Sequence, residues 1–183
     1  MTQETADQQQ YETNDEMIMQ NVAANNIIKN HIIASITLGL IPIPLIDLSA
    51  LSATQMNMLR SLSNHYDIPF NESETKALIT SLVSGSLPVL SVVGLSSFAK
   101  LIPGVGTLAG SASLSVIAGA VTYAVGQVFT AHFEAGGTLE DFNPKQTQTF
   151  FKQKFKEGKS FVLSIRDEIK SATSEAKTTP EQT

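Results

Sequence analysis

The sequence contains no cysteine, no tryptophan and only three histidines, and charged side chains make up just 16% of its 183 residues. The absence of cysteine excludes disulfides, thiol catalysis and the usual structural zinc sites. His31, His65 and His132 lack metal-ligand spacing such as HExxH, so we expect them to be surface or hydrogen-bonded histidines. A net charge of −5 argues against a general nucleic-acid binder. These absences predict a protein without catalytic residues, cofactor or metal site.

Charged residues are unevenly distributed along the chain. Residues 1–31 carry five acids and one lysine, residues 32–131 carry four acids and three bases, and residues 132–183 carry eight of each. The polar segment 1–14 is predicted to be disordered, because it cannot bury enough apolar area to offset the cost of ordering. It also lacks the basic region and apolar stretch of a secretory signal. The last residues, 173–183, are likewise expected to be a disordered tail.

Apolar residues recur at helical spacing along the chain, and no alternating strand pattern is present. The first helix is predicted from Asp15 to about Leu40, before a segment whose prolines cannot continue a helix. The next helix is predicted to start near Pro44 or Asp47. We therefore expect residues 15–142 to form an all-α domain built as a helical bundle.

Capping motifs predict the boundaries of the later helices. Asn71, with Glu74 three residues on, forms a capping box. The pair Gly136–Gly137 is expected to end a long helix. Asn143-Pro144 has the order of a cap followed by a first helical residue, and it opens an amphipathic helix predicted over residues 143–172.

Two stretches, residues 77–99 and 101–131, carry no charged side chain. Each exceeds the ~20 residues that a helix needs to cross the hydrocarbon core of a bilayer. The pair predicts a long apolar helical hairpin over residues 77–131. This hairpin either inserts into the membrane, with both outer ends on the cytoplasmic side because basic residues flank them, or forms the core of a soluble bundle. Serines and glycines dilute both stretches, and Pro88 interrupts the first.

A stripe of small residues runs along the second uncharged stretch at spacings of three and four. Such stripes let helix backbones approach closely, in lipid or in a soluble bundle. We expect this stripe to pack on the first helix of the hairpin. Its members are Ser111, Ser115, Gly119, Thr122 and Gly126.

An acid borders the apolar segment 32–46, where a charge is costly without partners. Asp47 and Gln55 are eight residues apart and therefore share a helix face. Asp47 either caps the helix by accepting hydrogen bonds from free backbone N–H groups, or it forms a buried polar site with Gln55, structural or for a ligand.

The last predicted helix is basic as well as amphipathic. Its phenylalanines and aliphatic residues fall largely on one face, and Glu157 is the single acid among five lysines over residues 145–159. Such a helix suits an anionic lipid surface. It equally suits docking of the apolar face on the bundle with the lysines in water. The lipid-surface candidates are Lys152, Lys154, Lys156 and Lys159.

Three segments resemble a bacterial family, domain of unknown function 697. They are IPIPLIDLSA at 41–50, LIPGVGT at 101–107, and TYAVG at 122–126 followed by FEAGG at 133–137. The resemblance implies an all-helical, membrane-associated module that in many relatives follows an Era- or dynamin-like GTPase domain. This chain lacks that domain, so any GTPase partner would be a separate protein. The family has no established activity.

Two functions therefore stay open. The first is a non-catalytic membrane-associated module at the bacterial inner membrane, with cytoplasmic termini and membrane lipid as partner, serving as anchor or partner of a GTPase. The second is a soluble, cytoplasmic all-α interaction domain that forms homo-oligomers through its apolar helices. An enzyme that uses Asp47 is disfavoured, because few ionisable groups lie near it in the sequence.

We predict that the isolated chain neither binds nor hydrolyses GTP or ATP. Gly158-Lys159-Ser160 matches the end of a P-loop, but the motif also requires a glycine where this chain has Gln153. Calorimetric titration with each nucleotide and magnesium should show no heat of binding. Micromolar affinity that disappears in Lys159→Ala would contradict this prediction.

Overall fold

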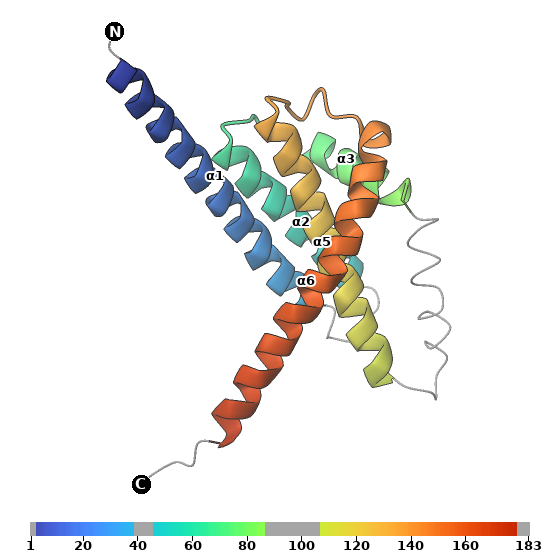
Figure 1. Cartoon of the computed structure of the whole chain (residues 1–183). Coiled ribbons are helices and arrows are strands. Elements are labelled where there is room, and N and C mark those ends of the chain that lie inside the picture. Colours follow the sequence, from blue (N-terminus) through green and yellow to red (C-terminus); the bar gives the residue numbers. More distant parts are fainter. Residues whose placement is uncertain (1–2, 39–45, 87–106, 179–183) are drawn as a thin grey trace.

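The computed structural model describes residues 3–38, 46–86 and 107–178, with side chains over 12–37, 50–86 and 115–166. These ranges contain helices and no strands, so the predicted all-α class is confirmed (Figure 1). The helices are α1 (Gln3–Leu38), α2 (Ile46–His65), α3 (Glu72–Ser84), α5 (Thr107–Glu134) and α6 (Pro144–Thr178).

The predicted caps are confirmed by the hydrogen bonds at the helix ends. Asn71 Oδ1 accepts from the backbone N–H of Glu74 at 3.2 Å at the start of α3. After α5 the chain turns through Gly136, whose φ of 82° lies in the left-handed region that favours glycine. Asn143 Oδ1 accepts from the backbone N–H of Lys145 at 3.1 Å and so caps α6.

The prediction of disorder is wrong for residues 3–14 and 173–178, which are helical. No glycine or proline interrupts residues 3–38. Once the inner part of α1 is held by packing, each further residue adds a backbone hydrogen bond without a new nucleation cost. The polar segment therefore continues the helix that the inner part of α1 has already formed. The same reasoning applies to the last residues of α6.

Helix α5 occupies the centre of the bundle and contacts α1, α2 and α6 (Figure 1). Because partners surround it, its buried side chains are distributed around its circumference rather than along one stripe. The largest fully buried side chains come from every described helix: Ile28, Ile32, Met58, Leu59, Leu62, Leu82, Val125, Val128, Phe129, Phe151, Phe155 and Val162.

The two uncharged stretches do not pack as expected where they are described. α3 ends at Ser84 and packs against α2 and α6, while residues 87–106 lie outside the described residues. In the described part of the chain, one helical segment, Ser115–Glu134, is long and apolar enough to cross a membrane. Of the apolar stretch that qualifies this segment, 67% is buried inside the protein. The buried core helix of a bundle meets the same test. Both alternatives for the hairpin, membrane insertion and the core of a soluble bundle, therefore stay open.

Two glycines of the small-residue stripe pack on α1 and α6. The expected partner, the first helix of the hairpin, lies largely outside the described residues, so its packing on the stripe stays a prediction. A Cβ on Gly119 would lie 2.8 Å from Val162 Cγ2 and 3.1 Å from Ile36 Cγ1. A Cβ on Gly126 would lie 2.7 Å from Ile28 Cγ1. Real Cβ contacts are longer than this, so both glycines are required by the close approach of the helices.

A buried hydroxyl pair reinforces the same interface. Thr122 Oγ1 of the stripe lies 2.8 Å from Ser35 Oγ of α1, and Ser35 also donates to the carbonyl of His31. Ser115 is fully buried as well, whereas the side chain of Ser111 lies outside the described residues. The paired hydroxyls let small polar residues occupy a helix interface without leaving a donor unsatisfied.

We predict that Gly119→Leu destabilises the bundle by about 3 kcal/mol or more, because the side chain would overlap Val162 and Ile36 at the centre of the fold. Urea unfolding followed by circular dichroism measures the change. Ser160→Leu places the same side chain at an exposed position of α6 and is the matched control. Equal unfolding midpoints for the two variants would show that the interface adjusts to the extra volume.

Candidate functional site on helix α6

Helix α6 uses one face to pack on the bundle. Phe151, Phe155, Val162 and Ile165 are spaced at whole turns and are buried. Gly158 lies on the same face, where a Cβ would stand 2.9 Å from Tyr123 Cδ1 of α5. The glycine therefore serves helix packing within a continuous helix. This setting is unlike the strand–loop–helix that a P-loop requires.

Basic side chains form a row on one flank of this packed face. At 100° per residue, all five fall in a sector of roughly 80°, and Leu163, 38% exposed, lies among them. None of the five forms an ion pair with another described residue. Two of them are exposed and three are half-buried. We call this set the basic row: Lys145, Lys152, Lys156, Lys159 and Arg166.

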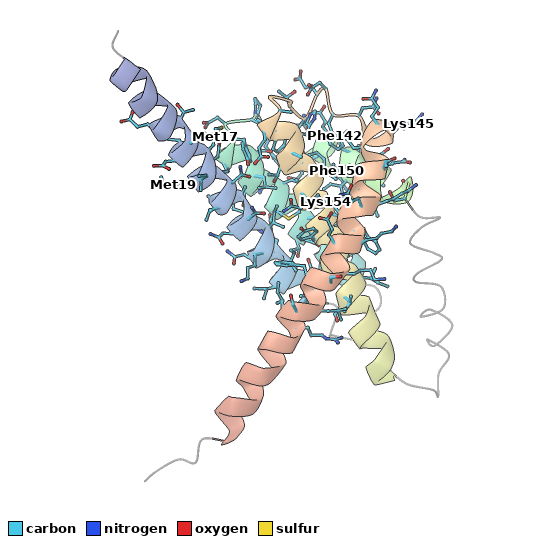
Figure 2. All side chains as sticks on the ribbon, viewed as in Figure 1. Met17, Met19, Phe142, Lys145, Phe150 and Lys154 are labelled. Carbon is cyan, nitrogen blue, oxygen red and sulfur yellow. The ribbon has the colours of Figure 1, made fainter. Side chains whose placement is uncertain are left out.

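Lys154 does not belong to the basic row, although it was a lipid-surface candidate. It lies on the opposite flank, where its Nζ is 2.7 Å from Glu157 Oε2 and 5.3 Å from the ring centroid of Phe150 (Figure 2). Hydrogen bonds from Lys154 and Gln153 hold the pKa of the Glu157 carboxyl below its usual value. The charge of Lys154 is therefore balanced locally, unlike that of its neighbours.

The other three lipid-surface candidates, Lys152, Lys156 and Lys159, lie together in the basic row. Sequence reasoning omitted Lys145 and Arg166 from the candidates. Lys145 lies seven residues before Lys152, and Arg166 lies seven residues after Lys159. Because seven residues are close to two helical turns, this spacing places both on the same side of the helix and could have identified them.

The candidate polar pair of α2, Asp47 and Gln55, is described for one partner only. Gln55 is buried, with 4% of its surface exposed. Asp47 lies in the first turn of α2, and its side chain is outside the described residues. Its capping role and its pairing with Gln55 both stay predictions.

The three histidines each have a backbone partner, as predicted. His31 Nδ1 lies 2.8 Å from the carbonyl oxygen of Ile27, and His65 Nε2 lies 2.9 Å from that of Gln20. His132 Nε2 lies 2.8 Å from the carbonyl oxygen of Thr138. Among the described residues, no three His, Cys, Asp or Glu side chains gather in a way that could hold a metal ion.

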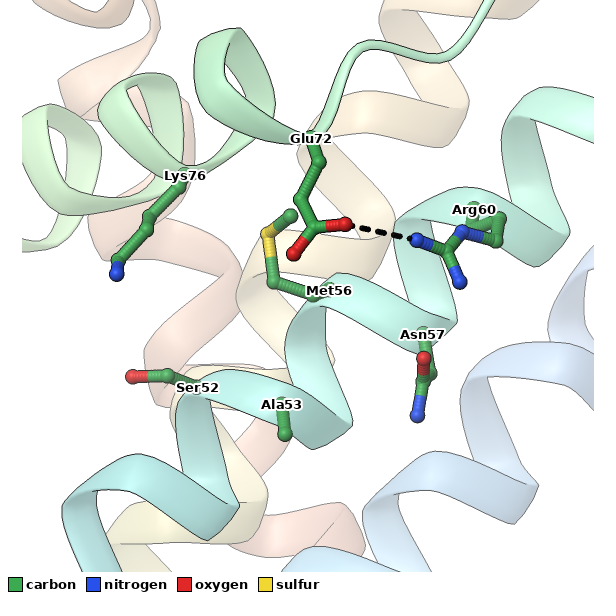
Figure 3. A pocket seen from close by; sticks show the side chains of 7 residues that line it. All are labelled: Ser52, Ala53, Met56, Asn57, Arg60, Glu72 and Lys76. Carbon is green, nitrogen blue, oxygen red and sulfur yellow. Dashed lines mark hydrogen bonds and ion pairs between the residues drawn. The ribbon is translucent and has the colours of Figure 1, made fainter.

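An open groove of about 430 Å³ lies between α2 and α3. The Arg60–Glu72 ion pair, 3.1 Å long, bridges it, and Met56 and Lys76 also line it (Figure 3). Arg60 also lies over the ring of Phe70, 5.0 Å from its centroid. Both ion-pair side chains are at least half exposed. They link the two helices at the surface and offer no nucleophile with an adjacent base.

Comparison with known proteins agrees with the resemblance found in the sequence. The family model described as "Domain of unknown function (DUF697)" matches residues 2–160. Magnetosome membrane protein 22 of Magnetospirillum gryphiswaldense is 37% identical over 147 residues, which cover 80% of this chain and 75% of that protein. No solved structure matches the chain significantly. The match over most of the sequence shows that the chain belongs to the DUF697 family.

Proposed function

We propose that this protein is a non-catalytic, membrane-associated helical module that contacts anionic lipid through the basic row of α6. The observation that carries the proposal is a row of five basic side chains on one flank of the helix, free of ion pairs among the described residues. The similarity to a protein named for the magnetosome membrane supports the same association.

The chemistry of the row fits a lipid headgroup surface. Lys152, Lys159 and Arg166 are half-buried, so their aliphatic stems cover apolar surface while their charged ends extend toward water. Each basic residue near an anionic membrane contributes about 1 kcal/mol of attraction. Leu163 lies among these charges and can enter the boundary between headgroups and acyl chains.

The proposal of a non-catalytic role rests on the arrangement of the ionisable groups. In the described part of the chain, the ion pairs are Arg60–Glu72 and Lys154–Glu157, and His132 Nε2 lies 3.2 Å from the Asp141 carboxylate; each of these contacts includes an exposed carboxylate. The Asp141 carboxyl accepts from the backbone N–H and the hydroxyl of Thr138, and these bonds lower its pKa. These contacts join neighbouring helices, successive turns of α6 and the turn after α5, and they do not prepare an acid or base for proton transfer at neutral pH.

Several finer features belong to the same proposal and stay predictions. They are a location at the bacterial inner membrane, cytoplasmic termini and a separate GTPase as partner. The second candidate function is a soluble interaction domain that self-associates through its apolar helices, and the burial of α5 among its own neighbours supports the soluble bundle that this function requires.

We predict that the combined variant Lys152→Gln/Lys156→Gln/Lys159→Gln loses about a hundredfold in affinity for anionic vesicles. The reason is the loss of three attractions of about 1 kcal/mol each. Co-sedimentation with phosphatidylglycerol and phosphatidylcholine vesicles measures the effect. Lys154→Gln is the matched control, because Glu157 already balances that lysine, and it should bind nearly as well as the wild type. An equal loss in both variants would rule out a specific role for the basic row.

We predict that an alkaline carbonate wash releases the protein from membranes. Residues 115–134 of α5 are largely buried against α1, α2 and α6, so contact of this part with lipid tails would require these helices to separate from it. A protein that associates only through the basic row is peripheral and is extracted by this treatment. Retention in the membrane pellet would instead support insertion of the apolar hairpin.

A further inference from the structure

The first part of α1 extends beyond the bundle (Figure 1). The side chains of residues 12–22 are all exposed, His65 of α2 contacts the backbone carbonyl of Gln20, and the buried core begins at Ala24. Figure 2 shows Met17 and Met19 on this part of the helix, away from the packed core. Four large apolar side chains are half or more exposed here: Met17 at 50%, Ile18 at 60%, Met19 at 69% and Val22 at 55%. Such a cluster is typical of an interaction surface.

The charges around this cluster define the kind of partner that it fits. Glu12, Asp15 and Glu16 lie among the apolar residues, and Glu4 and Asp7 lie farther toward the start of the same helix. The first base of the chain is Lys29. An anionic membrane would repel this segment. A complementary partner would therefore combine positive charge with apolar side chains.

The basic row of α6 has this chemistry. It offers five bases with Leu163 among them, against three acids (Glu12, Asp15 and Glu16) and four apolar side chains on the projecting part of α1. The helices that carry the two surfaces are long enough to lie side by side, because the backbones of residues 145–166 and of residues 3–22 each span about 30 Å at about 1.5 Å per residue. We propose that the projecting segment of α1 binds the basic row of α6 in a second copy of this chain.

The two surfaces of one chain cannot meet in this fold. α1 and α6 approach each other near Gly119 of α5, where Ile36 of α1 and Val162 of α6 both pack against this glycine. From this crossing the two helices diverge toward the start of each, and α2 and α5 lie between the projecting part of α1 and the first part of α6 (Figure 1). The contact is therefore intermolecular and joins two different surfaces. After one such contact, one copy keeps an unused basic row and the other keeps an unused α1 segment, so the assembly grows until it closes into a ring or continues as a chain.

This inference does not depend on the proposed binding to lipid. Lipid and a second copy of the chain would compete for the same basic row. Variants on α1 therefore test self-association and leave the lipid-binding surface intact, so the failure of either proposal can be recognised separately.

Sedimentation velocity at low ionic strength tests the contact. We expect concentration-dependent association of the wild type, weakened at high salt, since the screening length falls from about 10 Å at about 0.1 M salt to about 3 Å at 1 M. The variant Glu12→Lys/Asp15→Lys/Glu16→Lys should lose about tenfold in association, because exposed ion pairs each contribute modestly. It should bind anionic vesicles at least as well as the wild type. Glu140→Lys changes an exposed acid outside α1 and is the control.

Charge exchange makes the test specific. Lys152→Glu/Lys156→Glu/Lys159→Glu should also lose self-association when it is studied alone. A mixture of the base-reversed and acid-reversed proteins should associate again, because each α1 then faces an α6 of opposite charge. A wild type that stays monomeric at low salt, or a mixture that fails to associate, would overturn the proposal.

Disulfide trapping gives a second measurement that does not rely on charge reversal. The chain has no native cysteine, so Ile18→Cys and Lys156→Cys each introduce one thiol. Under mild oxidation, a mixture of these two variants should form the mixed dimer in clear excess over either homodimer. Random proportions of the three dimers would contradict the proposed pairing.

Discussion

The close approach of α5 to α1 and α6 is the constraint on which the rest of this bundle depends. Gly119 and Gly126 leave no room for a Cβ, because Val162, Ile36 and Ile28 fill the space beside them. Gly158 of α6 meets Tyr123 of α5 in the same way. Since interiors are packed as densely as crystals, these glycines determine how far apart the three long helices lie.

This packing changes how the apolar composition of α5 is understood. A helix without charged side chains over most of its length suits both a membrane span and the centre of a bundle. In this fold its apolar surface is largely covered by α1, α2 and α6, and the Ser35–Thr122 pair satisfies polar groups at that interface. The helices that cover α5 then present their own outer faces to the surroundings, and those faces carry the charges.

The outer faces of α1 and α6 have opposite character. The projecting part of α1 is acidic and apolar, whereas one flank of α6 is basic. Lys154 illustrates how local pairing decides which charges are available, because Glu157 balances it while the basic row has no such partner. The two proposed contacts, with anionic lipid and with a second copy, both follow from this unbalanced row.

The sequence by itself determined the all-α class, the helix caps at Asn71, Gly136 and Asn143, and the basic amphipathic character of the last helix. These features depend on residues within one or two helical turns of each other, so local spacing is sufficient to recognise them. The separation of Lys154 from the basic row is also local, because it follows from helical spacing and from Glu157 three residues on. Tertiary structure alone decided that Gly119 and Gly126 pack on α1 and α6. That outcome depends on which side chains meet across the bundle, and contacts between residues far apart in the chain leave no periodic signal in a single sequence.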